Sequence, residues 1–105
     1  GRVRRARSGI AGQTVPVPQR LVREHDLTSD TGVLVTGLEA GSAAQAAALR
    51  ERDIIVTFDG EPVSTVDELH RLLTADYIGV RSPLTLLRRG QRLALTIVPT
   101  ESSVD

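Results

Sequence analysis

The chain has 105 residues, with 13 basic and 13 acidic side chains, no cysteine and only two aromatic residues, Phe58 and Tyr77. This length predicts one domain that buries about two-thirds of its unfolded surface, enough to fold without disulfides or metal ions. Zero net charge gives no overall attraction to nucleic acid or anionic membranes. Two aromatic rings are too few for a base-stacking platform. The lack of cysteine excludes thiolate catalysis and zinc–thiolate sites.

The first seven residues contain four arginines, at positions 2, 4, 5 and 7. A charge run of this kind predicts a solvated face or a flexible lead-in. The alternative is a segment whose guanidinium groups lie near an anionic ligand end. The glycine-containing segment Ser8–Gly12 then precedes the first strand. Gln13–Pro18 alternates valine and proline, which excludes a central strand and predicts an extended connection.

A short helix and a strand are predicted between residues 18 and 38. Pro18 suits the first turn of a helix over Gln19–Asp26. His25 lies in the charged end of this helix, so it is expected to be a surface residue rather than a base or a ligand. Val33–Leu38 is apolar and β-branched, which predicts a strand.

The segment from Gly41 to Gly60 is predicted to form a connected helix–strand unit. Ser42–Leu49 is rich in alanine, and Ser42 is placed to cap the first amides of a helix. After a charged break at residues 50–52, the apolar run Asp53–Phe58 predicts a buried strand. The turn pair Asp59-Gly60 ends this strand.

A second amphipathic helix is predicted over Val66–Thr74. Thr65 and Glu68 have the spacing of a capping box at its start. Two apolar faces are available on this helix. The face expected to pack on the core comprises Leu69, Leu72 and Leu73, and the adjacent face comprises Val66, His70 and Leu73.

The last third of the chain predicts a β-hairpin. Ser82–Arg88 and Gln91–Pro99 each place leucine or isoleucine at every second residue, and Arg89-Gly90 separates them. One face of the hairpin is therefore expected to be buried. Glu101–Asp105 has no pattern and is expected to be a frayed tail or linker.

The unit over residues 41–60 carries a resemblance to a known family. Together with Pro62-Val63, it resembles the core of a PDZ domain of the kind found in bacterial HtrA/Deg-type serine proteases. The matching residues are Ser42, Ala44, Ala47, Leu49, Asp53, Ile54, Ile55, Asp59, Gly60, Pro62 and Val63. Ala43 and Gln45 replace a proline and an alanine of the family pattern, and Ala48 and Arg52 replace two glycines. These glycines often adopt positive φ, which predicts a strained or differently shaped turn over residues 48–52.

The resemblance implies a fold and a domain organisation. The implied fold is α+β, a small partly open antiparallel β-barrel or sandwich of five to six strands flanked by two to three helices, with HtrA-type (permuted) strand order. Residues 1–100 would form a single PDZ domain, with 101–105 outside it. A serine protease domain would lie N-terminal to Gly1.

The resemblance also implies a function for this domain. Such domains capture C-terminal peptides by β-strand addition. They thereby recruit substrate to the attached protease domain or regulate it. The parent protein, not this chain, would be the serine endopeptidase.

The peptide-binding residues follow from the same resemblance. They are Ser8, Gly9, Ile10, Ala11, Gly12, Val66, His70 and Leu73. Arg7-Ser8-Gly9-Ile10 corresponds to the carboxylate-binding loop, in which Arg7 and Ser8 are more polar than usual. Glycine lets consecutive N–H groups converge on a terminal carboxylate, and Arg7 is expected to assist them.

The rest of the groove is expected beside Ile10–Gly12, where the ligand strand would lie. Ile10, Val66 and Leu73 would form the pocket for the last side chain of the ligand. His70 would either donate to a serine or threonine hydroxyl two residues inward or contact an apolar group there.

No catalytic site, metal site or cofactor is expected in this chain. Ser8 lacks the Gly-x-Ser-x-Gly context of a nucleophile elbow. Asp67 and His70 lie three residues apart on one helix, which gives the carboxylate no means of orienting the ring toward Ser8. The two histidines are distant in sequence, and no cluster has metal-ligand spacing. No run approaches the ~18 apolar residues of a membrane span.

The polar pair Arg7-Ser8 leaves a second function open. The chain would then be a structural or interaction domain that mediates self-association or packing between domains, with its groove occupied. The expected partners are C-terminal peptides of substrate proteins, the attached protease domain and further copies of a homo-oligomeric parent, without nucleic acid. The family implies protein quality control in the bacterial cell envelope, in a periplasmic or other extracytoplasmic location.

Overall fold

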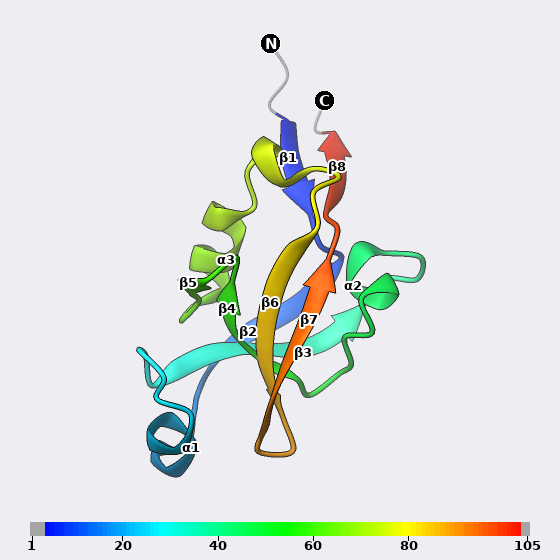
Figure 1. Ribbon diagram of the computed structural model, residues 1–105. Helices are drawn as coiled ribbons and strands as arrows, with labels where there is room; N and C mark the ends of the chain where they lie inside the picture. Colours follow the sequence, from blue (N-terminus) through cyan, green and yellow to red (C-terminus); the bar gives the residue numbers. More distant parts are fainter. Residues whose placement is uncertain (1–3, 104–105) are drawn as a thin grey trace.

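The computed structural model describes residues 4–103. The elements in chain order are β1 (Arg4–Arg7), β2 (Ile10–Pro16), α1 (Gln19–Glu24), β3 (Thr31–Leu38), α2 (Ala43–Ala46), β4 (Ile54–Phe58), β5 (Glu61–Pro62), α3 (Val66–Leu72), the 3-10 turn η1 (Ala75–Tyr77), β6 (Ser82–Arg88), β7 (Gln91–Ile97) and β8 (Thr100–Ser103). Figure 1 shows α1 at one end of the molecule and the pair β1 and β8 at the other end.

The larger sheet is antiparallel, with the strand order β2-β3-β4-β6-β7 and with β5 paired to β4. Its two outer strands, β2 and β7, are not paired with each other, so the sheet does not close. The predicted α+β fold, a partly open antiparallel sheet flanked by helices, is confirmed. A second sheet of two strands, β1 and β8, adds to it.

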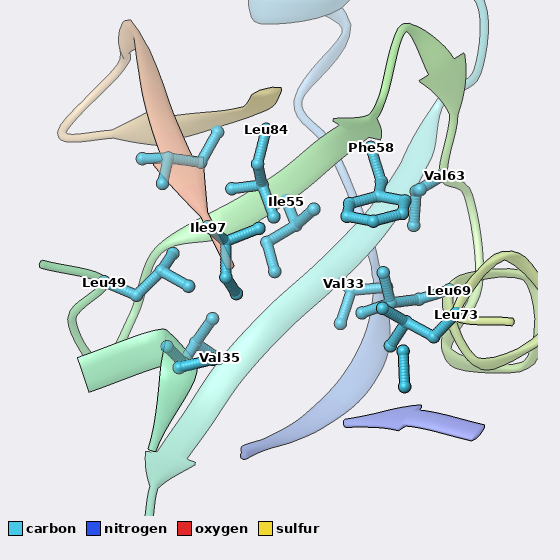
Figure 2. Close-up of a cluster of buried hydrophobic side chains, with 14 residues drawn as sticks. Val33, Val35, Leu49, Ile55, Phe58, Val63, Leu69, Leu73, Leu84 and Ile97 are labelled. Atoms are coloured by element: carbon cyan, nitrogen blue, oxygen red, sulfur yellow. The ribbon is translucent and has the colours of Figure 1, made fainter. Parts of the chain in front are cut away.

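The hydrophobic core explains why four of the five residues of β4 are apolar. Ile55 and Phe58 pack with Leu69 of α3 on one face of the sheet (Figure 2). Val56 packs on the other face with Leu21 of α1. The pairing of β4 with β6 is irregular between Ile55 and Thr57, which lets Ile55 and Phe58 share a face despite their odd spacing. Because both faces of β4 are covered, apolar side chains stabilise the fold on each.

The caps of the two short helices confirm the predicted starts. Ser42 Oγ accepts a hydrogen bond from the Gln45 N–H at 3.2 Å, and Gln45 Oε1 accepts one from the Gly41 N–H at 2.7 Å. Gln45, a departure from the family pattern, thus completes a reciprocal cap. Thr65 Oγ1 likewise accepts from the Glu68 N–H at 3.1 Å. The helix α2 spans only one turn, shorter than the predicted range of residues 42–49, because the left-handed turn at 48 ends it.

The turn over residues 48–52 adopts a strained conformation, as the sequence predicts. Ala48 has a φ of 68° and Arg52 a φ of 79°, both in the left-handed region that favours glycine. The chain therefore retains the backbone shape that the family pattern provides with glycine, and it does so with two side chains that raise the conformational energy.

Parts of two predictions about the chain ends are wrong. Residues 101–103 are not frayed, because β8 pairs with β1 from Arg4–Ser103 to Arg7–Thr100. The arginine-rich lead-in is correspondingly a strand from Arg4 onward rather than a flexible segment, and its Arg5 and Arg7 are exposed, as expected of a solvated face. Pairing across the domain, which no local pattern reveals, supplies the backbone partners of both strands. Arg2 and residues 104–105 lie outside the described residues.

The segment predicted as an extended connection is partly a strand. Residues 13–16 continue β2, which pairs with β3 as far as the pair Pro16–Thr31. Pro16 is compatible with this role because β2 is an outer strand, where a missing N–H costs no ladder bond. The residues after Pro16 leave the sheet and lead to α1.

Candidate functional site

The free edge of β2 lies beside α3. No other described strand pairs with this edge, so its outward main-chain groups are open to an added strand. The start of α3 is tied to β2, because the Val66 N–H donates to Thr14 Oγ1 at 3.1 Å. A fixed helix alongside an open strand edge makes a groove in which an extended peptide fits.

The other end of α3 is tied to β1. The Ala6 N–H donates to the Leu73 carbonyl at 3.3 Å, and Arg5 Nη2 donates to the His70 carbonyl at 2.5 Å. These donors bond to carbonyls at the C-terminal end of α3, where the His70 carbonyl also accepts from the Leu73 N–H at 3.3 Å. The helix is therefore held at both ends, and the segment between β1 and β2 lies next to its C-terminal turn.

A cavity of about 250 Å³ opens at this point. It is lined by Arg5, Ala6, Arg7, Ser8, Gly9, Ile10, Glu39, His70 and Leu73. Its lining combines main-chain groups of a tight loop, apolar surface from Ile10 and Leu73, and a charged rim. This composition suits the end of a peptide, which has an apolar side chain beside a carboxylate.

The loop Ser8-Gly9 is fixed by the start of α2. The Ser8 carbonyl accepts from the Ala44 N–H at 2.8 Å, and the Gly9 carbonyl accepts from the Glu39 N–H at 3.0 Å. Gly9 has a φ of +82°, and a Cβ at this position would lie 2.2 Å from the Cβ of Ser42. Glycine is therefore required here both by the conformation and by the close approach to α2.

The amides of this loop differ in their hydrogen bonds. The Gly9 N–H has no acceptor among the described residues. The Ile10 N–H donates over a long 3.3 Å to Ser8 Oγ, and Ser8 is buried. One amide is thus available to an anionic group, and the other is occupied by a neutral hydroxyl that a carboxylate would replace as the stronger acceptor.

The rim of the cavity carries an ion pair between Arg7 and Glu39. Both side chains are about half exposed, at 48% and 59%. An exposed pair of this kind is weak, so Arg7 can exchange its partner at small cost.

The structure brings together six of the nine residues predicted for the site. They are Arg7, Ser8, Gly9, Ile10, His70 and Leu73, which line one cavity. Ala11 and Gly12 follow on β2, where a bulge shifts the register between them, and Val66 lies at the far end of α3 beside Thr14. Three lining residues, Arg5, Ala6 and Glu39, were not predicted, because the pairing of β1 and the turn after β3 bring them to the loop.

The residues considered for catalysis do not form a catalytic arrangement. Ser8 and His70 line the same cavity, but no described hydrogen bond joins them, and Asp67 does not line it. His25 Nε2 lies 3.0 Å from the Gly90 carbonyl, where it supports the β6–β7 turn. Residues 4–103 contain no group of acidic, histidine or cysteine side chains arranged to hold a metal ion. None of the helices in that range has the length and apolar character needed to cross a membrane.

Comparison with known proteins gives consistent matches. The PDZ domain family model matches residues 12–98. The probable periplasmic serine endoprotease DegP-like of Chlamydia trachomatis serovar D is 31% identical over 109 aligned positions, which cover 100% of this chain and 22% of that protein. The chain spans about a fifth of the length of the curated relatives it matches.

Solved structures share the fold. The HtrA-type protease AlgW with a decapeptide has a TM-score of 0.77 at 20% identity, covering 97% of this chain and 31% of that one. The HtrA3 PDZ domain bound to a phage-derived ligand has a TM-score of 0.71 at 23% identity, covering 98% of this chain and 92% of that one.

Proposed function

This chain belongs to the PDZ domain family and is similar to the PDZ domains of HtrA-type serine proteases, and from this premise we propose that it captures the C-terminal ends of proteins by β-strand addition. It is a non-catalytic domain. The observation that carries the proposal is the position of the Gly9 N–H, which has no acceptor among the described residues, beside the open edge of β2.

In this proposal the ligand adds as an outer strand next to β2. Its main chain exchanges hydrogen bonds with the free edge that starts at Ile10, and its terminal carboxylate accepts from the amides of Gly9 and Ile10. The bulge between Ala11 and Gly12 changes the direction of this edge directly after the loop. The last side chain of the ligand packs against Ile10 and Leu73.

The charged and polar residues of the site have distinct roles in the proposal. Arg7 turns from Glu39 to the ligand carboxylate. His70 contacts the side chain two residues before the ligand end, where its ring can donate to a hydroxyl. Val66, at the start of α3, contacts the ligand farther from its carboxylate. Ala11 and Gly12 provide backbone contacts only.

The proposed biological setting follows from the relatives. A curated relative is named a periplasmic serine endoprotease, and AlgW is described as an HtrA-type protease with a decapeptide. We infer that this domain delivers protein C-termini to an attached serine protease domain or regulates it, in an extracytoplasmic compartment of a bacterial cell envelope. We also propose that the parent protein, which contains this domain and the protease domain, forms a homo-oligomer.

A second candidate function has one observation in its favour. Ser8 Oγ accepts a hydrogen bond from the Ile10 N–H, and Glu39 forms an ion pair with Arg7. Polar groups of the chain itself therefore already bind part of the loop that would hold a ligand carboxylate. In this alternative the free edge of β2 pairs with a second copy or with an adjacent domain instead of a peptide.

An amide NMR titration of the 105-residue chain distinguishes the two functions. One apolar-ended peptide is added in two forms, with a free C-terminal carboxylate and with a C-terminal amide. Peptide capture gives shifts at Gly9, Ile10 and His70 with the free acid only. Equal shifts with both forms, or none with either, contradict carboxylate-dependent capture. Dimerisation that broadens the β2 amides would support the alternative.

A further inference from the structure

A second cavity, of about 210 Å³, lies away from the peptide groove. It is lined by Arg50, Glu51, Arg52, Asp53, Arg88 and Arg89. None of these six residues lines the cavity beside Gly9, so the two sites are separate. Every lining residue is charged, which makes an electrostatic function the natural one to consider.

The charges in this cavity do not cancel. Asp53 is 1% exposed, and its two carboxylate oxygens accept from Nε and Nη2 of Arg88, each at 2.8 Å. This pair is neutral as a unit. The guanidinium groups of Arg50, Arg52 and Arg89 have no acceptor among the described residues, and Glu51 is the only carboxylate left near them in the cavity lining. A local excess of positive charge therefore exists in a chain whose net charge is zero.

Hydrogen bonds fix the backbone of the two turns that carry these arginines. The Arg50 N–H donates to Asp53 Oδ2 at 2.9 Å, and the Arg52 N–H donates to the Val35 carbonyl at 2.8 Å. Across the cavity, His25 supports the β6–β7 turn through the Gly90 carbonyl at 3.0 Å. Arg88 Nη2 also donates to the Ala48 carbonyl at 3.1 Å, which joins the two sides. The backbone from which the three arginines project is thus fixed, and their side chains are exposed to solvent.

Two of the three free arginines are held in a conformation that favours glycine. Arg52 has a φ of 79° and Arg89 a φ of 54°. Glycine would serve both turns without steric cost, so each arginine is present despite a strained backbone. Strain of this kind occurs preferentially at ligand-binding positions, where the side chain supplies what glycine lacks.

We propose that Arg50, Arg52 and Arg89 form a docking site for a carboxylate-rich segment of a partner protein. Guanidinium groups bind carboxylates through paired hydrogen bonds, and three of them around one small cavity match a short run of aspartate or glutamate. Duplex DNA binding requires more phosphate contacts than three arginines supply, and single strands require the aromatic stacking that this chain lacks. An acidic peptide is therefore the ligand class that the charge and size favour.

The proposal is tested with a hexaglutamate peptide that is acetylated at its N-terminus and amidated at its C-terminus. The amide removes the terminal carboxylate, so the peptide groove does not contribute. Amide NMR shifts are expected at residues 50–53 and 88–90 and not at Gly9 or Ile10, and the affinity should fall as salt is raised. No shifts, or shifts spread over all exposed arginines, would overturn the docking site.

Matched variants separate a specific site from general charge attraction. The double variant Arg52→Gly, Arg89→Gly is expected to bind hexaglutamate at least tenfold more weakly while unfolding at a higher temperature, because it removes both charges and both strained side chains. The control Arg20→Gln, Arg23→Gln removes two exposed charges from α1 and should leave the affinity within twofold. The control Ala48→Gly removes strain alone and should also bind normally.

Two further outcomes would overturn the proposal. One is an equal loss of affinity in the variants of residues 20 and 23, which would show attraction to charge in general. The other is tighter binding of a short DNA duplex than of hexaglutamate at the same residues, which would show that the ligand class is wrong.

Discussion

The carboxylate of Asp53 and the guanidinium of Arg88 form a two-point ion pair between the loop after α2 and the strand β6. The hydrogen bond to Asp53 raises the pKa of Arg88 above its ordinary value, so Arg88 stays charged. The same carboxylate accepts the Arg50 N–H. This pair thus fixes the loop that contains the strained turn and two of the three free arginines, Arg50 and Arg52.

Removing the cation of this pair is expected to destabilise the fold. Arg88→Ala leaves the buried carboxylate of Asp53 without its partner, which should lower the free energy of unfolding by about 3 kcal/mol. Urea denaturation measures this change. The control Arg92→Ala removes an exposed arginine from β7 and should change stability by less than about 0.5 kcal/mol. Equal losses in both variants would show that the pair has no special role.

Gly9→Ala is expected to damage both stability and peptide capture. The added Cβ would meet Ser42 at 2.2 Å in a backbone with a φ of +82°. We expect the free energy of unfolding to fall by about 2 kcal/mol or more, and binding to a free-acid peptide to be lost. Gly41→Ala is the matched control, because Gly41 has a φ of +71° but open space around it. The control should lose only about 1 kcal/mol and retain binding. Unfolding by heat and the NMR titration give the two measurements.

Ala48→Gly is expected to stabilise the chain. Ala48 is exposed and has a φ of 68°, so glycine removes steric strain without removing a buried contact. The free energy of unfolding is expected to rise by about 1 kcal/mol, because the strain removed exceeds the entropy cost of the more flexible glycine in the unfolded chain. Ala46→Gly, in the single turn of α2, should instead lose about 0.5–1 kcal/mol. A loss in both variants would contradict the left-handed turn.

The phenol of Tyr77 is expected to titrate at unusually high pH. Its hydroxyl donates to Asp59 Oδ2 at 2.6 Å, and this bond raises the pKa of Tyr77. Because the folded state favours the neutral phenol, the stabilisation is fully present below about pH 10, the ordinary tyrosine value, and is lost as the pH rises through the folded value.

Absorbance measures this titration without ambiguity, because Tyr77 is the only tyrosine in the chain. Asp59→Asn should return the midpoint toward the ordinary value, and asparagine tolerates the left-handed φ of 53° at that position. A midpoint that does not move in this variant would show that the bond to Asp59 is not formed in solution.

The Arg7–Glu39 pair is expected to compete with the ligand. Glu39→Gln should strengthen binding of a free-acid peptide by about threefold, because it frees Arg7 and removes a negative charge from the rim. Arg7→Gln should weaken binding by a similar factor. The amidated peptide serves as the control, and its binding should not respond to either variant. Isothermal calorimetry on the original chain, the two single variants and the double variant would measure how strongly Arg7 and Glu39 are coupled in peptide binding.

Local sequence patterns predicted those helices and strands whose structure depends on residues close together in the chain. The apolar run after Asp53 forms the buried strand β4, and the caps at Ser42 and Thr65 start their helices. The left-handed turn at Ala48 and Arg52 follows from the glycines that the family pattern places there. The resemblance also predicted most of the cavity at Gly9 and His70.

Pairing between distant segments decided the rest. From the sequence alone, local periodicity, caps and turn residues predicted the individual helices and strands, and the resemblance to the PDZ family implied the fold, the loop at Gly9 and the groove beside α3. Only the tertiary structure joined β1 to β8, placed Glu39 beside Arg7 and gathered the arginines at 50–52 and 88–89 around Asp53. Contacts of this kind depend on how the strands are ordered in the sheet, and no short stretch of sequence contains that information.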